Sequence, residues 1–195
     1  MPFINTVVDF INDHLKGGSL NKNNFQPGKY YGVASSIGSA DDKAILIPGV
    51  INTDGEIEEV SPDDIYNIQI YHKMIGNNYG VQKKSSYGDD YDVVTTTEMQ
   101  AFVFAQSDKI KMTAEQLETH IVFGMPGGIS NLLLSDLNIK LNTIQVISSD
   151  MDKIRNFKNE YQGVQFFLSP EHIFFSVRYQ VRQLFDRSCV DACLC

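Results

Sequence analysis

Apolar residues recur every three to four positions near the start of the chain, and this spacing predicts an amphipathic helix over residues 3–15. The apolar stripe of this helix is Phe3, Val7, Ile11 and Leu15. Gly17 and Gly18 follow it, as glycine often does after a last helical turn. We therefore expect an N-terminal helix that lays one face on the core.

Two further helices are predicted from cap signals. The sequence TAEQ at residues 113–116 fits a capping box, and GMPGG at residues 124–128 ends the helix that follows. A third helix is expected to begin at a cap on Ser149 or Asp150 and to end near Tyr161. Its inward stripe is expected to be Met151, Ile154, Phe157 and Tyr161.

Segments rich in β-branched and aromatic residues predict strands between these helices. They are residues 30–37, 44–51, 65–75, 93–106, 139–147, 165–168 and 173–181. The last segment alternates strictly, and a period of two predicts one buried and one solvated face. The residues expected in the core are Ile173, Phe175, Val177, Tyr179 and Val181. Those expected in solvent are Phe174, Ser176, Arg178 and Gln180, with Arg182 continuing the row.

The alternation stops at residues 76–92, GNNYGVQKKSSYGDDYD. This stretch is polar, rich in glycine and too long for an ordinary hairpin turn. We expect two long strands joined by a protruding loop, and long loops on a compact domain are often functional. The fold class predicted for residues 1–195 is therefore α+β. It is a single domain with a mostly antiparallel sheet, about three helices and the arm at 76–92.

Charge narrows the classes of partner. The chain has 195 residues and a formal net charge of −8. Proteins that grip nucleic acid need clustered lysine and arginine, whereas an acidic pore lets DNA slide without holding it. No apolar run reaches the roughly 18 residues that span a bilayer, and the N-terminus lacks the pattern of a signal peptide. We expect no membrane contact and a cytoplasmic site of assembly.

All three cysteines lie in the C-terminal tail, residues 186–195. Cys189, Cys193 and Cys195 have the spacing C-x3-C-x-C, whereas a closed zinc site needs four ligands and commonly uses C-x2-C pairs. Two interpretations stay open: a metal site completed by a fourth ligand such as His172, or reduced thiols that pack as small apolar groups. We predict no cofactor and no catalytic residues.

An enzyme remains the other alternative to weigh. It would need convergent polar groups in a pocket, and the best candidates are Tyr66, Tyr71, His72 and Glu98 on the two long strands. No pair of histidines has helical metal-binding spacing, and no phosphate loop or nucleophile elbow is present in the sequence.

Charged and aromatic side chains of the arm and of the last strand are the candidate contacts between subunits. They are Tyr79, Lys83, Lys84, Tyr87, Asp89 and Asp90 in the arm, with Arg178 and Arg182 in the strand. The two arginines lie roughly 13 Å apart on one face, because alternate strand residues are about 7 Å apart. They are predicted either to meet acidic groups of another subunit or simply to line a wet sheet face. The arm is either a clamp on a neighbouring copy or a hairpin tip.

The order of these elements resembles the tail-terminator and tail-completion proteins of tailed bacteriophages, which form rings at the head–tail junction. The stretches that carry the resemblance are PFINTVVDFINDHL, TTTEMQAFVFAQSDKIKMTAEQLETHI and FFSVRYQVRQLF. They cover between a quarter and a third of the chain. The composition, rich in Asn, Ile, Asp and Lys, fits an AT-rich genome such as that of a crAss-like phage.

The resemblance implies a structural virion protein without catalytic activity. It implies a neck or connector ring of six or twelve copies around the DNA channel, with a long hairpin reaching adjacent subunits. The implied partners are copies of the chain itself and the phage portal, neck or tail proteins, while DNA passes through the lumen without specific binding. The alternatives are a small cytoplasmic metal-binding adaptor and an uncharacterised enzyme.

Overall fold

The computed structural model describes residues 2–18, 23–39, 45–52, 54–83, 91–126, 132–134, 139–164 and 168–185. The helices are α1 (Pro2–Gly17), the 3-10 turn η1 (Asn23–Phe25), α2 (Ser107–Ile110), α3 (Ala114–Gly124) and α4 (Lys153–Glu160). The strands are β1 (Gly28–Gly38), β2 (Leu46–Ile51), β3 (Ile57–Glu59), β4 (Ile68–Lys83), β5 (Tyr91–Gln106), β6 (Leu132–Leu134), β7 (Ile139–Asp150) and β8 (His172–Phe185).

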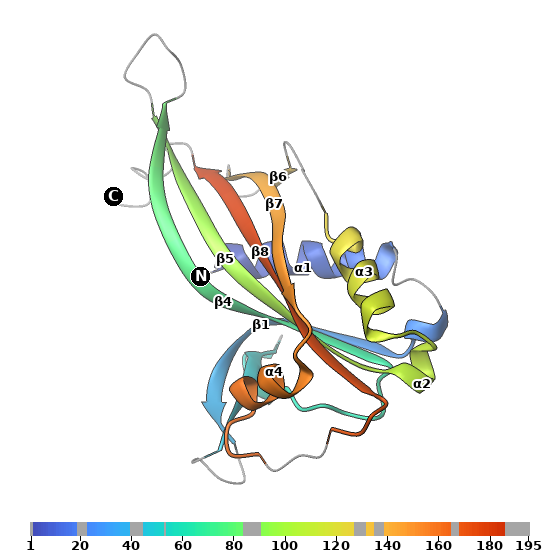
Figure 1. Cartoon of the computed structure of the whole chain (residues 1–195). Coiled ribbons are helices and arrows are strands. Elements are labelled where there is room, and N and C mark those ends of the chain that lie inside the picture. Colours follow the sequence, from blue (N-terminus) through green and yellow to red (C-terminus); the bar gives the residue numbers. More distant parts are fainter. Residues whose placement is uncertain are drawn as a thin grey trace.

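The strands form one twisted sheet in the order β3-β2-β1-β4-β5-β8-β7-β6. All pairs are antiparallel except β1 with β4. The mostly antiparallel α+β fold is thus confirmed, while the parallel pair was not predicted. The β4–β5 hairpin is the longest feature and projects past the helices (Figure 1).

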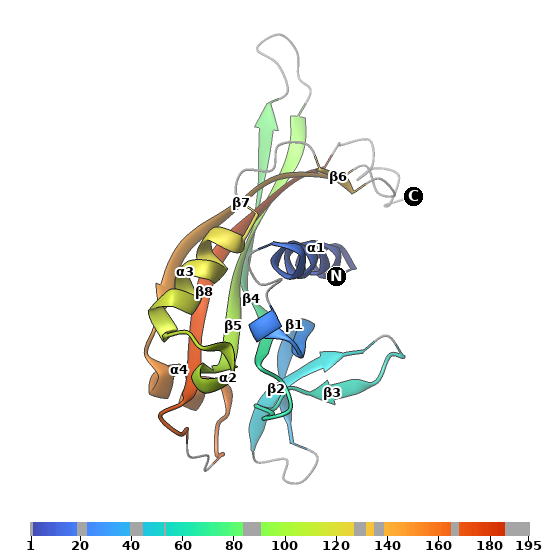
Figure 2. The ribbon, with the colours of Figure 1, turned by 90° about the vertical axis from the view of Figure 1, so that its right-hand side faces the viewer.

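Each face of the sheet carries its own core. We call the first the α1 face, where α1, α2 and α3 cover the sheet, and the second the α4 face, where α4 and the β2–β3 hairpin cover one end (Figure 2). Val7, Ile11 and Leu15 of α1 are fully buried against the α1 face, so the predicted N-terminal stripe is confirmed at these three positions. The capping box of α3 is also confirmed, because Thr113 and Gln116 bond reciprocally.

The predicted solvated face of β8 is wrong at its first residues. Phe174 and Ser176 are 1 % exposed because α4 and β2, which come from distant parts of the chain, close over the α4 face there. Arg178 stands beyond that cover and is half exposed. The opposite row, Ile173 to Val181 in alternate positions, is buried as predicted.

Two other expectations needed correction. The stretch 76–92 is mostly strand, since residues 76–83 and 91–92 continue the ladder between β4 and β5 after a bulge between Met74 and Gly76. The polarity of residues 76–83 reflects their exposure to solvent, since these residues form strand and not loop. Residues 84–90 of the predicted arm lie outside the described residues. Residues 165–167 of the strand expected at 165–168 also lie outside them.

The inward stripe of α4 was also partly wrong. Ile154 is 62 % exposed, while Asn156 and Glu160 are buried beside Phe157 and Tyr161. The two polar residues can be buried because each has a partner: Asn156 bonds backbone oxygens and Ser176, and Glu160 pairs with Lys73.

Candidate assembly surface

The outer part of β4 leaves one backbone edge open. β1 pairs with β4 only as far as His72, whereas β5 pairs with β4 as far as Lys83. Within the described part of the chain, no strand pairs with the other side of β4 from Lys73 to Lys83. A strand edge of this kind presents free N–H and C=O groups that can accept another strand.

The side chains along this edge do not protect it. Residues 74–82, MIGNNYGVQ, contain no charged group, although edge strands are commonly blunted by charge or proline. Tyr79 is 70 % exposed and Val81 is 73 % exposed. Both side chains point to the α1 face, because they pair with Thr95 and Val93 in a register that alternates along β5. The edge therefore combines free backbone groups with exposed apolar side chains.

A second open edge lies on β7, on the far side of the same four strands. β6 pairs only with Ile139–Leu141, and no other described strand pairs with the remainder of this side of β7. Residues 141–149, LNTIQVISS, again contain no charge. Bulges flank residues 143–146, which form the regular part of this edge. Ile144 and Val146 face the α1 side there, with Ile144 buried.

The part of the α4 face that lies between these two edges is not covered by α4, and its side chains are mostly polar. A shallow hollow of about 820 Å³ crosses the four strands, and its lining includes Gln82, Thr96, Thr143, Gln145, Gln180 and Arg182. Arg182 donates to Gln82 at 2.7 Å, and Arg178 lies 3.7 Å from Glu98. Both arginines predicted to meet another subunit thus have partners within the chain. Amide and hydroxyl groups dominate the surface around them.

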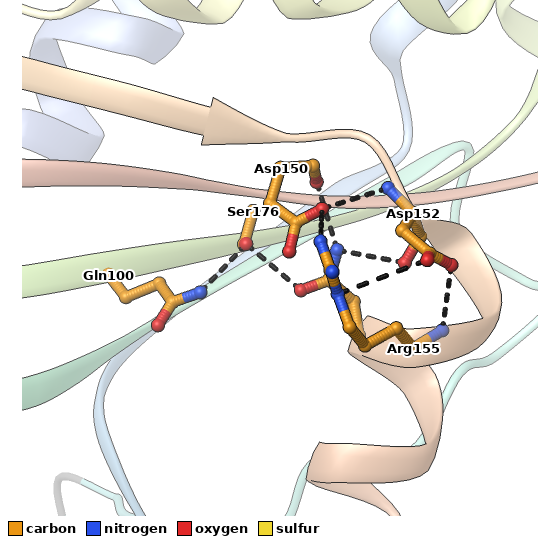
Figure 3. A network of polar contacts seen from close by, with 6 residues as sticks. Gln100, Asp150, Asp152, Arg155 and Ser176 are labelled. Atoms are coloured by element: carbon orange, nitrogen blue, oxygen red, sulfur yellow. Dashed lines mark hydrogen bonds and ion pairs between the residues drawn. The ribbon is translucent and has the colours of Figure 1, made fainter.

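A network of polar contacts lies on this face where α4 begins to cover it (Figure 3). Ser176 accepts from Gln100 at 2.7 Å and donates to Asn156 at 3.1 Å. The amide of Asn156 donates to the backbone oxygens of Asp150 and Asp152, so α4 is fixed to the ends of β7 and β8. The network joins four elements and leaves these buried polar atoms satisfied.

Asp150 and Arg155 form the exposed end of the network. Arg155 donates to Asp150 at 2.7 Å, and Asp152 caps α4 through the N–H of Arg155 at 3.0 Å. Partial burial alone would raise the pKa of Asp150, but the bonds from Arg155 and from the Asp152 N–H hold it below its ordinary value. Arg155 and Arg178 also border a pocket of about 280 Å³, but Asp150 lies in the same wall. Each of the two arginines has its own carboxylate partner, Asp150 for Arg155 and Glu98 for Arg178.

His72 is fully buried, and both nitrogens of its ring have hydrogen-bond partners within the fold. Its Nε2 lies 3.0 Å from Asn12 Oδ1, and its Nδ1 lies 2.8 Å from the Tyr179 hydroxyl. Asn12 donates its amide to the Tyr31 carbonyl, so its oxygen must accept, Nε2 must carry the proton and Tyr179 must donate to Nδ1. Burial lowers the pKa of His72 to about 3, and burial also raises the pKa of Tyr179. The neutral imidazole joins α1, β4 and β8.

A buried ion pair stands at the boundary between the covered and the open parts of β4. Lys73 lies 3.0 Å from Glu160, whose side chain is 7 % exposed. The Tyr71 hydroxyl also donates to Glu160 at 3.3 Å, and burial raises the pKa of this tyrosine well above its ordinary value. This pair ties α4 to β4 one residue before Met74, after which the bulge interrupts the register.

The enzyme candidates do not converge. Tyr71 and His72 are neighbours on a strand and point to opposite faces, and both are buried. Tyr66 lies before β4, whereas Glu98 lies beyond the bulge and beside Arg178. The structure therefore contradicts the idea of a pocket built from these four residues.

The remaining predicted contacts divide between described and undescribed residues. Tyr79 lies on the open edge of β4, and Lys83 is its last residue. Lys84, Tyr87, Asp89, Asp90, Cys189, Cys193 and Cys195 lie outside the described residues. Among the described side chains, no group of three or more His, Cys, Asp or Glu is placed to hold a metal. Sequence reasoning found Tyr79 but missed both open edges, which only the strand order reveals.

No protein-family model matches the sequence, and no curated protein matches it significantly. Of the described helices, none has the length and apolar character needed to cross a membrane.

Proposed function

We propose that this chain is a structural subunit that assembles with copies of itself into a ring, of the kind that tailed phages place at the head–tail junction. The observation that carries the proposal is the outer part of β4, which combines an open backbone edge, exposed Tyr79 and Val81, and no charge over residues 74–82. Such an edge is a liability in a free monomer and an interface in an assembly.

The proposed assembly is a virion component made in the host cytoplasm, with six or twelve copies around a DNA channel and with portal, neck or tail proteins as neighbours. The net charge of −8 supports this role, because a pore that DNA crosses must not grip it. The bare part of the α4 face offers mostly uncharged amide and hydroxyl groups, whereas strong binding to nucleic acid depends on phosphate neutralisation by lysine and arginine. We propose that the subunit performs no catalysis.

The test is the mass of the native particle under gentle ionisation. The unmodified chain is expected to give a closed oligomer of one defined copy number. Val81→Lys places a charge on the open edge and is expected to give a folded monomer, because pairing would bury that charge. The matched control is Ile57→Lys on β3, where the replaced side chain is 65 % exposed and the oligomer should persist. A monomeric unmodified chain, or a Val81→Lys oligomer of unchanged mass, would contradict the proposal.

A further inference from the structure

The open edges of β4 and β7 have matching chemistry. In a chain with 21 % charged residues, 74–82 of β4 and 141–149 of β7 are both free of charge. They lie at opposite sides of the same four strands, β4-β5-β8-β7. Neither edge has charged side chains that would prevent pairing with another strand. This suggests that the β4 edge of one copy is covered by the β7 edge of a second copy.

Strand direction favours this joint. β4 is antiparallel to β5, β5 to β8, and β8 to β7, so β4 and β7 of one subunit run in opposite directions. A neighbouring copy in the same orientation therefore presents its β4 antiparallel to the β7 of the first. Antiparallel strands can share backbone hydrogen bonds along the whole contact without any change of fold.

The side chains agree with the same arrangement. Tyr79 and Val81 point to the α1 face, and so do Ile144 and Val146 of β7. In the joint, the exposed apolar pair of one copy would continue the apolar row of the next. On the α4 face, Gly80 and Gln82 would lie beside Thr143 and Gln145, extending the polar hollow across the boundary.

We propose that β4 of one subunit pairs with β7 of the next in a head-to-tail joint centred on residues 78–82 and 143–146. This proposal rests on the proposed ring function and specifies the two strands through which neighbouring subunits would make contact. A two-fold joint of β4 with β4 would leave the β7 edge of each copy open, whereas the head-to-tail joint covers both edges and generates a ring when the rotation between neighbouring copies closes. The bulges beside residues 143–146 restrict the contact to that regular stretch.

The test is disulfide capture between single-cysteine subunits. Cys189, Cys193 and Cys195 are first changed to Ser in the full chain. Gln145→Cys is then mixed in turn with Asn78→Cys, Gly80→Cys and Gln82→Cys, all exposed positions on the α4 face. A Cβ at Gly80 meets nothing within 4 Å, so the cysteine fits. Lys158→Cys on α4, mixed with Gln145→Cys, is the matched control.

We expect rapid formation of a mixed dimer for one of the three pairs, at least tenfold faster than for the control. A disulfide between two copies of Gly80→Cys, or between two copies of Gln82→Cys, without a mixed dimer would overturn the joint in favour of a two-fold β4 contact. Oligomers of the expected mass with no mixed dimer would overturn the joint and leave the ring function standing. Monomers throughout would overturn both.

Discussion

The two parts of β4 share one strand and one partner, yet they differ in every side-chain environment. Residues 68–72 are at most 2 % exposed, because α1 covers one side and the β2–α4 layer covers the other. Residues 76–82 pair with β5 just as regularly, yet none of them is buried. Backbone pairing therefore continues past the point where burial ends.

The two parts of β4 therefore differ in what they contribute: one is buried in the cores, and the other leaves a strand edge free for pairing. The inner part of β4 contributes to two apolar cores, and it contains the fully buried His72. The outer part contributes little to either core and keeps its outer edge open. We interpret the inner part as the source of folding stability and the outer part as the surface left for assembly.

The largest expected effect is on the free energy of unfolding of the monomer. Ile70→Ala removes a fully buried side chain and is expected to cost about 3 kcal/mol, whereas Tyr79→Ala removes an exposed one and should change stability by less than about 0.5 kcal/mol. Denaturant unfolding measures both in the Val81→Lys background, where assembly is blocked. Equal costs would abolish the distinction between the two parts.

The ion pair at the boundary sharpens the comparison. Lys73→Met leaves the carboxylate of Glu160 buried without a cation and is expected to cost about 3 kcal/mol. Adding Glu160→Gln removes the unpaired charge and should restore most of that loss. A single variant as stable as the double variant would show that the pair does not hold α4 to β4.

Acidic pH should lower the stability of the folded protein through protonation of His72 in the inner part of β4. The pKa of this residue is about 3 when folded and ordinarily 6.5, so between these values the unfolded chain binds a proton that the folded chain does not. Stability is therefore expected to fall as the pH is lowered from 6.5 towards 3, by up to about 1.4 kcal/mol per pH unit. His72→Gln can keep both hydrogen bonds and cannot titrate, so its pH dependence should be shallower by this amount. Identical slopes would contradict the buried neutral imidazole.

The smallest contrast lies on the α4 face of β8. Ser176→Ala leaves the buried Asn156 oxygen without its hydroxyl donor and should cost roughly 1–2 kcal/mol. Arg182→Ala removes an exposed contact to Gln82 and should cost less than about 0.5 kcal/mol. Thermal unfolding of the two variants, six positions apart on one strand, measures where the cover of α4 ends. A larger loss of stability for Arg182→Ala than for Ser176→Ala would contradict the conclusion that the cover of α4 ends between these two residues.

Local patterns predicted much of the fold. The stripe of α1, the capping box of α3 and the core row of β8 each depend on residues close in sequence, and each is confirmed. The errors arise where distant segments decide the environment. Phe174 is buried because α4 and β2 cover it, and α4 buries Asn156 and Glu160 because β8 and β4 supply their partners.

The proposed assembly surface was harder to predict from the sequence. The stretch 76–83 looked like a loop because a strand with solvent around it needs no apolar alternation. Whether an edge is open depends on the strand order, and the parallel contact of β1 with β4, which ends at His72, cannot be read from local periodicity. The absence of charge in 74–82 and 141–149 was the available signal, and only the sheet order gives it meaning.

The most direct test of the account is amide hydrogen exchange of residues 74–82 in the unmodified protein and in Val81→Lys, with residues 101–105 of β5 as the internal reference. In the unmodified particle, we expect the amides of 74–82 that do not face β5 to be protected, because a second copy pairs with them. In Val81→Lys these amides should exchange rapidly, while the buried reference stays protected in both. Rapid exchange of 74–82 in both proteins would contradict the claim that the outer edge of β4 is an assembly surface.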